Sequence, residues 1–143
     1  MPPELVFDRG LGDLFVIRTA GQALDGAALC SIEFGVEKLN IPLVMVLGHQ
    51  KCGAVAATIE VVEKKAVAHG QINTLVEIIK PAVDKVMGQP GDLLENSVRA
   101  NIQLTVDKLK ASPFLSKYLD KGKIKIVGAR YDLDTGVVDI IMP

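Results

Sequence analysis

One short apolar segment constrains the fold of this chain more than any other part of the sequence. Leu43–Leu47 lies between a proline and a glycine, so it is too short for a helix and has the length of a strand. Because no polar residues alternate with the apolar ones, we expect a strand over 42–48 that is buried on both faces of a parallel sheet. His49 and Cys52 follow directly, at the strand end where ligands of open α/β sheets gather.

The pair His49 and Cys52 has the chemistry of a zinc site. Imidazole nitrogen and thiolate sulfur are usual zinc ligands, but a protein site needs three or four donors, so the pair alone also fits a loop histidine and a buried free cysteine. A third hypothesis makes Cys52 a nucleophile activated by His49, although no orienting third group is evident. Elsewhere, Cys30 is expected to fill the core from a helix and His69 to lie solvated in a loop.

The composition indicates one globular domain, 1–143. Hydrophobic residues make up 49% of the 143 residues, which is enough for a buried sheet and for some apolar surface that favours an oligomer. The net charge is −1 and no basic cluster exceeds Lys64–Lys65, which argues against nucleic-acid or anionic-membrane partners. There is no leader-like N-terminus, no apolar run of membrane length and only two cysteines, so we expect a cytoplasmic protein.

The remaining segments predict an α/β fold. Apolar spacing and capping residues predict a short helix from Pro2 and longer helices over 26–38, 54–68, 73–87, 92–110 and 113–119. Runs of β-branched and aromatic residues predict further strands near 14–18, 123–130 and 137–142. Asp132–Gly136 has the chemistry of a hairpin turn, so the last strand should return antiparallel. We therefore predict a mostly parallel sheet flanked by helices, with an antiparallel C-terminal edge strand.

Three sequence matches, in the right order, point to a known family. GHQKCG at 48–53 is preceded by FVIRTAGQ at 15–22 and followed by GARYDLDTGVV at 128–138. Together they resemble the β-class carbonic anhydrases over essentially the whole chain. The resemblance implies zinc-dependent, reversible hydration of carbon dioxide to bicarbonate and a proton. It also implies a homodimer or higher homo-oligomer, because that family's substrate pocket lies at a seam between two subunits.

The resemblance also implies roles for individual residues. In the family, two cysteines and one histidine hold zinc, and the fourth position carries water or an aspartate. His49 and Cys52 match the histidine and the second cysteine, which makes zinc the expected cofactor. Four residues match the family's carbon dioxide pocket: Phe15, Ala20, Phe34 and Gly53.

The family's first cysteine belongs to a Cys-x-Asp-x-Arg motif that these residues do not contain. That motif ends the family's first strand, in the middle of the sheet, upstream of the segment matched here by residues 2–5. We therefore expect the central strand to be missing, two zinc donors in place of three, and no assigned catalytic Asp-Arg pair. Asp8 and Arg9 resemble that pair in type only. The alternative hypothesis is an inactive carbonic-anhydrase-like module that serves assembly through exposed sheet edges.

Overall fold

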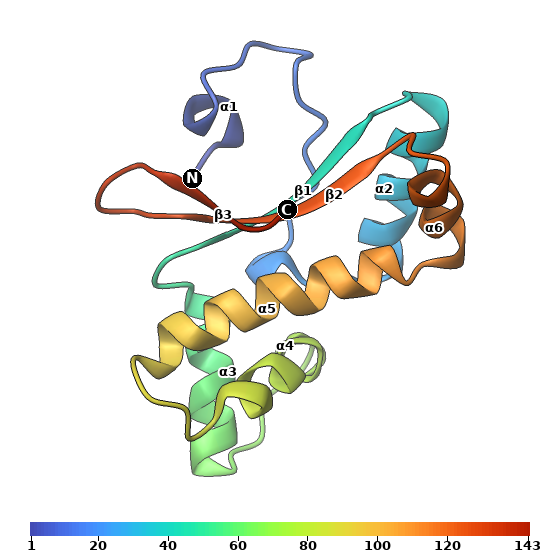
Figure 1. Cartoon of the computed structure of the whole chain (residues 1–143). Helices are drawn as coiled ribbons and strands as arrows, with labels where there is room; N and C mark the ends of the chain where they lie inside the picture. The colour runs from blue at the N-terminus through green and yellow to red at the C-terminus, as the bar shows by residue number, and fades with distance from the viewer.

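A computed structural model describes residues 1–143 and contains one three-stranded sheet. Its strands are β1 (Leu43–His49), β2 (Lys125–Tyr131) and β3 (Val138–Met142), in the order β1-β2-β3. β1 runs parallel to β2 from the pair Leu43 and Lys125 to the pair His49 and Tyr131, and β3 returns antiparallel along β2. The predicted α/β class with an antiparallel C-terminal edge strand is confirmed (Figure 1).

The helices begin where the sequence provides caps. The elements are α1 (Pro3–Val6), the 3-10 turn η1 (Ala20–Gln22), α2 (Gly26–Lys38), α3 (Gly53–Lys64), α4 (Ile72–Val86), α5 (Leu93–Lys110) and α6 (Pro113–Asp120). The side chains of Asp25, Asp92 and Ser112 accept hydrogen bonds from first-turn N–H groups of α2, α5 and α6. Two helices are shorter than predicted: α1 ends at Val6 and not at the expected Gly10 or Gly12, and α3 ends early because Lys65 adopts a left-handed conformation (φ 48°).

Helix α5 covers one face of the sheet, and α3 and α4 pack on its outer side (Figure 1). Ile102 of α5, which is fully buried, fixes this close approach. A Cβ atom at Gly48 of β1 would lie 2.6 Å from the Ile102 side chain, and one at Gly128 of β2 would lie 2.9 Å from it. The two glycines therefore let the helix sit directly on the backbone of both parallel strands.

The predicted strand over 14–18 is wrong. These residues have no regular structure, and none of their backbone groups takes part in a backbone hydrogen bond. A strand needs a neighbour for its N–H and C=O groups, and no strand of the sheet is hydrogen-bonded to this segment. The helices agree with the sequence because their hydrogen bonds are local, whereas this segment depends on a partner.

The same missing neighbour leaves β1 at the edge of the sheet. β1 is hydrogen-bonded to β2 alone, and only Val46 and Gly48 of its residues are fully buried. Leu43 remains 47% exposed, so the expectation of a strand buried on both faces is wrong for this part of β1.

No helix in the structure combines the length and the apolar character needed to cross a membrane.

Candidate functional site

The structure brings His49 and Cys52 together on one tight turn. His49 is the last residue of β1, and Cys52 is the residue that precedes α3. The turn closes because Lys51 takes a left-handed backbone conformation with φ 53°. Cys52 is only 4% exposed, belongs to the main apolar core and is a free thiol. A strand behind and a helix ahead thus fix the turn that carries both donors.

The imidazole ring of His49 is oriented by its own turn. Its Nδ1 atom lies 2.8 Å from the backbone oxygen of Gln50. A carbonyl oxygen only accepts hydrogen bonds, so in the neutral ring Nδ1 carries the proton and Nε2 keeps a free lone pair. This is the arrangement found in metal-binding histidines, where the nitrogen that does not bind the metal donates to an oxygen.

The number of donors falls short of a complete metal site. His49 and Cys52 fit zinc by ligand type, but no group of three or more His, Cys, Asp or Glu residues in the structure is placed to hold a metal ion. Asp8 and Arg9, the pair that resembles the family's Asp and Arg in type, are exposed in the loop after α1. The donor set present is therefore compatible with zinc and incomplete.

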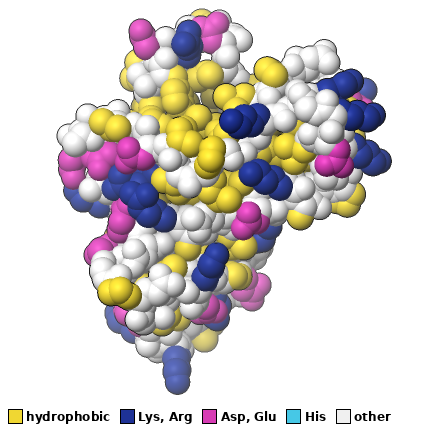
Figure 2. All heavy atoms as spheres, in the orientation of Figure 1, with side chains coloured by type: hydrophobic (Ala, Val, Ile, Leu, Met, Phe, Trp, Pro, Cys, Tyr) yellow, Lys and Arg dark blue, Asp and Glu magenta, His cyan; other side chains and the backbone are white.

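A groove of about 610 Å³ opens beside this turn, between residues 13–19 and β1. Most of its lining side chains are apolar. His49 and Phe15 are both among the residues that line it. Figure 2 shows apolar side chains gathered on this face, below the N-terminal segment. Among the other residues matched to the substrate pocket, Ala20 begins η1 and is exposed, Phe34 is 52% exposed on α2, and Gly53 is the first residue of α3. Of the four, only Phe15 lines the groove with His49.

The expectation for Cys30 is wrong, whereas that for His69 is confirmed. Cys30 is exposed on α2. The buried residues of that helix include Ala28, and a residue two positions later lies about 200° around the helix axis. Cys30 therefore faces solvent and is not placed to join the metal site. His69 is exposed in the loop between α3 and α4.

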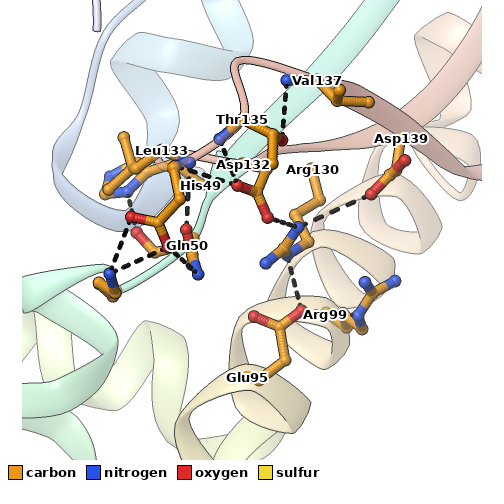
Figure 3. A network of polar contacts seen from close by, with 12 residues as sticks. His49, Gln50, Glu95, Arg99, Arg130, Asp132, Leu133, Thr135, Val137 and Asp139 are labelled. Atoms are coloured by element: carbon orange, nitrogen blue, oxygen red, sulfur yellow. Dashed lines mark hydrogen bonds and ion pairs between the residues drawn. The ribbon is translucent and has the colours of Figure 1, made fainter.

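Sequence reasoning missed a charged network at the same end of the sheet (Figure 3). The Arg130 side chain of β2 is 7% exposed, with Nε 2.6 Å from Glu95 Oε1 and Nη1 3.1 Å from Asp132 Oδ2. Although Nε lies this close to the Glu95 oxygen, its N–H does not point at it, so the contact is an ion pair without a hydrogen bond at Nε. The only sequence signal was an arginine followed two residues later by an aspartate, which also describes a solvated turn.

Arg130 and Asp132, two members of this network, have shifted pKa values. Burial opposes the charge on Arg130, but the hydrogen bond to Asp132 and the attraction of the Glu95 and Asp132 carboxylates outweigh it, so the pKa of Arg130 is raised. The backbone N–H of Thr135, at 2.9 Å from Asp132 Oδ1, is the main cause that lowers the pKa of Asp132 to about 2. Burial opposes that shift, while Arg130 and the N–H of Asp134 add to it.

Asp132 is expected to make stability fall between about pH 4 and pH 2. An unfolded aspartate titrates near ~3.9 and this folded one at about 2, so the stabilisation is complete above pH 4 and is lost as the pH falls through 2. Asp132→Asn removes this titration, so its urea midpoint should fall less steeply across that window. Asp120→Asn, at the exposed end of α6, is the control. Equal slopes for wild type and Asp132→Asn would contradict the assignment.

Comparison with known proteins identifies the family. A family model described as carbonic anhydrase matches residues 1–138. Carbonic anhydrase 2 of Mycobacterium tuberculosis is 40% identical over 136 residues, which are 93% of this chain and 65% of the relative. The carbonic anhydrase of Mycolicibacterium smegmatis is 38% identical over 140 residues, which are 96% of this chain and 67% of that protein. The chain therefore belongs to the carbonic anhydrase family.

Solved structures assign the fold to the β class of that family. The Coccomyxa β-carbonic anhydrase, solved in complex with acetazolamide, superposes with a TM-score of 0.84 at 25% identity and covers 99% of this chain and 66% of that one. The β-carbonic anhydrase CcaA gives a TM-score of 0.80 at 25% identity, with 100% and 78% covered. The resemblance seen in the sequence is confirmed. The chain spans about 65% of the length of the Mycobacterium tuberculosis relative.

Proposed function

We propose that this chain takes part in the reversible hydration of carbon dioxide to bicarbonate and a proton, with zinc as cofactor. The observation that carries the proposal is the turn after β1, which holds both His49, with Nδ1 bonded to the Gln50 carbonyl, and the buried free thiol of Cys52, in a member of the carbonic anhydrase family. When bound, zinc supplies a Lewis acid that makes water a nucleophile near neutral pH.

The chain's own residues would divide the remaining work. His49 and Cys52 would hold the metal, and further donors would have to come from a longer form of the protein or from another subunit. Phe15, an apolar wall of the groove beside His49, would exclude water from the substrate. Ala20, Phe34 and Gly53 are proposed to complete this pocket where subunits meet. The two free thiols fit a reducing compartment, so we propose the cytoplasm as the location.

The metal ligands are tested with Co²⁺ as a coloured substitute for zinc. The 143-residue chain is expected to bind Co²⁺ weakly and to give a thiolate-to-cobalt absorption band, because only two of the usual three or four donors are present. Cys52→Ser should remove the band, and His49→Ala should weaken binding roughly tenfold or more. Cys30→Ser is the matched control, because this cysteine is exposed on α2 and should not matter. A band that survives Cys52→Ser would contradict the proposed ligand.

We also propose that the chain forms a homodimer or a larger homo-oligomer. Phe15 and Phe34 are 46% and 52% exposed, and such apolar surface is commonly covered by a second subunit. The related Sordaria macrospora enzymes are described as tetrameric, at 17% identity to this chain. Sedimentation at micromolar concentration should give a dimer or more, and Phe34→Asp should weaken it roughly tenfold. Val67→Asp, at another exposed apolar residue, is the control; a wild-type monomer would contradict the proposal.

A second candidate function is that of an inactive assembly module. It is favoured by the incomplete donor set together with the open edge of β1, whose unpaired backbone groups can pair with another chain. The two candidates differ in the cobalt experiment. A module that only assembles does not have to bind metal through Cys52, so it is expected to give no cobalt absorption band that depends on this residue. Absence of any such band, combined with a stable oligomer, would favour the module.

A further inference from the structure

The turn that carries His49 and Cys52 is tied to the distant hairpin between β2 and β3. The connection runs through Gln50, which lies between the two donors in sequence (Figure 3). Gln50 Oε1 accepts from the backbone N–H of Leu133 at 3.1 Å, and Gln50 Nε2 donates to Asp134 Oδ2 at 3.1 Å. Both ends of one amide side chain are thus bonded to residues more than 80 positions later in the chain.

The backbone of Gln50 is fixed by the same hairpin. Its N–H donates to the carbonyl oxygen of Tyr131 at 3.0 Å, which extends the ladder between β1 and β2 by one residue. Lys51 Nζ adds a contact at 3.2 Å to each carboxylate oxygen of Asp134. The hairpin itself is rigid at this point, because Asp132 Oδ1 accepts from the N–H groups of Asp134 and Thr135. Side chain and N–H of Gln50 are therefore both anchored on an ordered turn.

The remaining polar group of Gln50 is the one that orients His49. Its carbonyl oxygen lies 2.8 Å from His49 Nδ1 and selects the tautomer in which Nε2 is free. The following residue, Lys51, has a left-handed φ of 53°, a conformation that is uncommon for residues other than glycine. If the side-chain anchors on the hairpin are removed, only the backbone N–H bond to Tyr131 ties Gln50 to it, and the Gln50 carbonyl gains freedom to turn away from the ring.

We propose that Gln50 and Asp134 are positioning residues that hold His49 in the Nδ1-protonated tautomer, with Nε2 available to a metal ion. The metal-binding consequence rests on the function proposed above, whereas the tautomer is a property of the metal-free chain. Gln50 acts through its carbonyl oxygen, and Asp134 acts through the amide of Gln50.

The tautomer is measured by nitrogen-15 NMR of the histidine rings in the full 143-residue chain without metal. Wild type should show His49 as the single Nδ1-protonated form, while exposed His69 serves as an internal reference. Gln50→Ala and Asp134→Ala should each shift His49 toward the Nε2-protonated form that free imidazoles favour. Asp134→Asn keeps an acceptor for the Gln50 amide and should retain the wild-type tautomer. Glu60→Gln, which breaks a surface ion pair on α3, is the control.

Zinc titration of the same samples gives the second readout. Gln50→Ala and Asp134→Ala should weaken the Zn²⁺-dependent shift of the His49 signals about tenfold, the loss typical of residues that orient a metal ligand. A wild-type tautomer in both alanine variants, with methyl spectra showing a native core, would overturn the proposal. Wild type that shows the Nδ1-protonated form without responding to zinc would contradict the proposed function and leave the positioning role supported.

Discussion

An extended chain that carries a Cys-x-Asp-x-Arg segment ahead of Met1 is expected to hydrate carbon dioxide at least roughly a thousandfold faster than the 143-residue chain. The reason is the donor count: His49 and Cys52 are the two proposed zinc donors, and no group of three or more His, Cys, Asp or Glu residues in the structure is placed to hold a metal ion. A catalytic zinc needs three protein ligands and one open position. A factor of a thousand is modest beside the 10⁶-fold or greater accelerations that enzymes reach.

The groove beside β1 is the structural reason to expect that such a segment docks. One wall is the unpaired edge of β1, and the other is residues 14–18, which make no backbone hydrogen bonds. An inserted strand would satisfy both sets of groups and would bring its carboxyl end beside His49. The added cysteine would then meet the two donors already on the turn.

Stopped-flow hydration assays on three proteins decide between the outcomes. The 143-residue chain should be nearly inactive, the extended chain active and zinc-dependent, and the extended chain with Cys52→Ser inactive again. Cys30→Ser in the extended chain is the control and should keep full activity. Robust zinc-dependent hydration by the short chain would mean that a further donor reaches the metal in an assembly of this chain.

Local sequence signals predicted most of this fold. Caps such as Asp25, Asp92 and Ser112 satisfy N–H groups a few residues away, so they fix helix starts whatever the rest of the chain does. The strand over 42–48 and the turn that follows it were predicted for a similar reason, since proline, glycine and the apolar run act within a few residues. His49 and Cys52 are together because they share that turn.

What the sequence could not predict depends on distant partners. Residues 14–18 have strand composition but no neighbour, so they form no strand. Cys30 is apolar in type, yet it lies exposed on α2. Gln50 and Asp134 look like surface polar residues in the sequence, and their role appears only when the β2–β3 hairpin is folded over the end of β1 (Figure 3). The same holds for Arg130, whose partner Glu95 lies on α5.

Arg130→Met is expected to destabilise the chain by about 2–3 kcal/mol. Arg130 is the buried cation of the network, and its loss leaves Asp132 without a charged partner and Glu95 with only the more exposed Arg99. A fully buried unpaired charge costs ~3–5 kcal/mol, but the Glu95 side chain is 28% exposed and that of Asp132 20%, so water relieves part of this. Urea unfolding of the variant at neutral pH measures the loss of unfolding free energy.

Arg99→Met provides a matched control on the same carboxylate. Arg99 Nε lies 2.8 Å from Glu95 Oε1, the oxygen that Arg130 also approaches, but the Arg99 side chain is 42% exposed. An ion pair this open to solvent contributes ~0–1 kcal/mol, so Arg99→Met should change the unfolding free energy much less than Arg130→Met. Equal losses in the two variants would mean that burial does not decide the strength of this network. A large loss of unfolding free energy for Arg130→Met alone would mean that the buried Arg130 stabilises the β2–β3 hairpin. Arg130 would then also support the turn that carries His49, because that turn is bonded to the same hairpin.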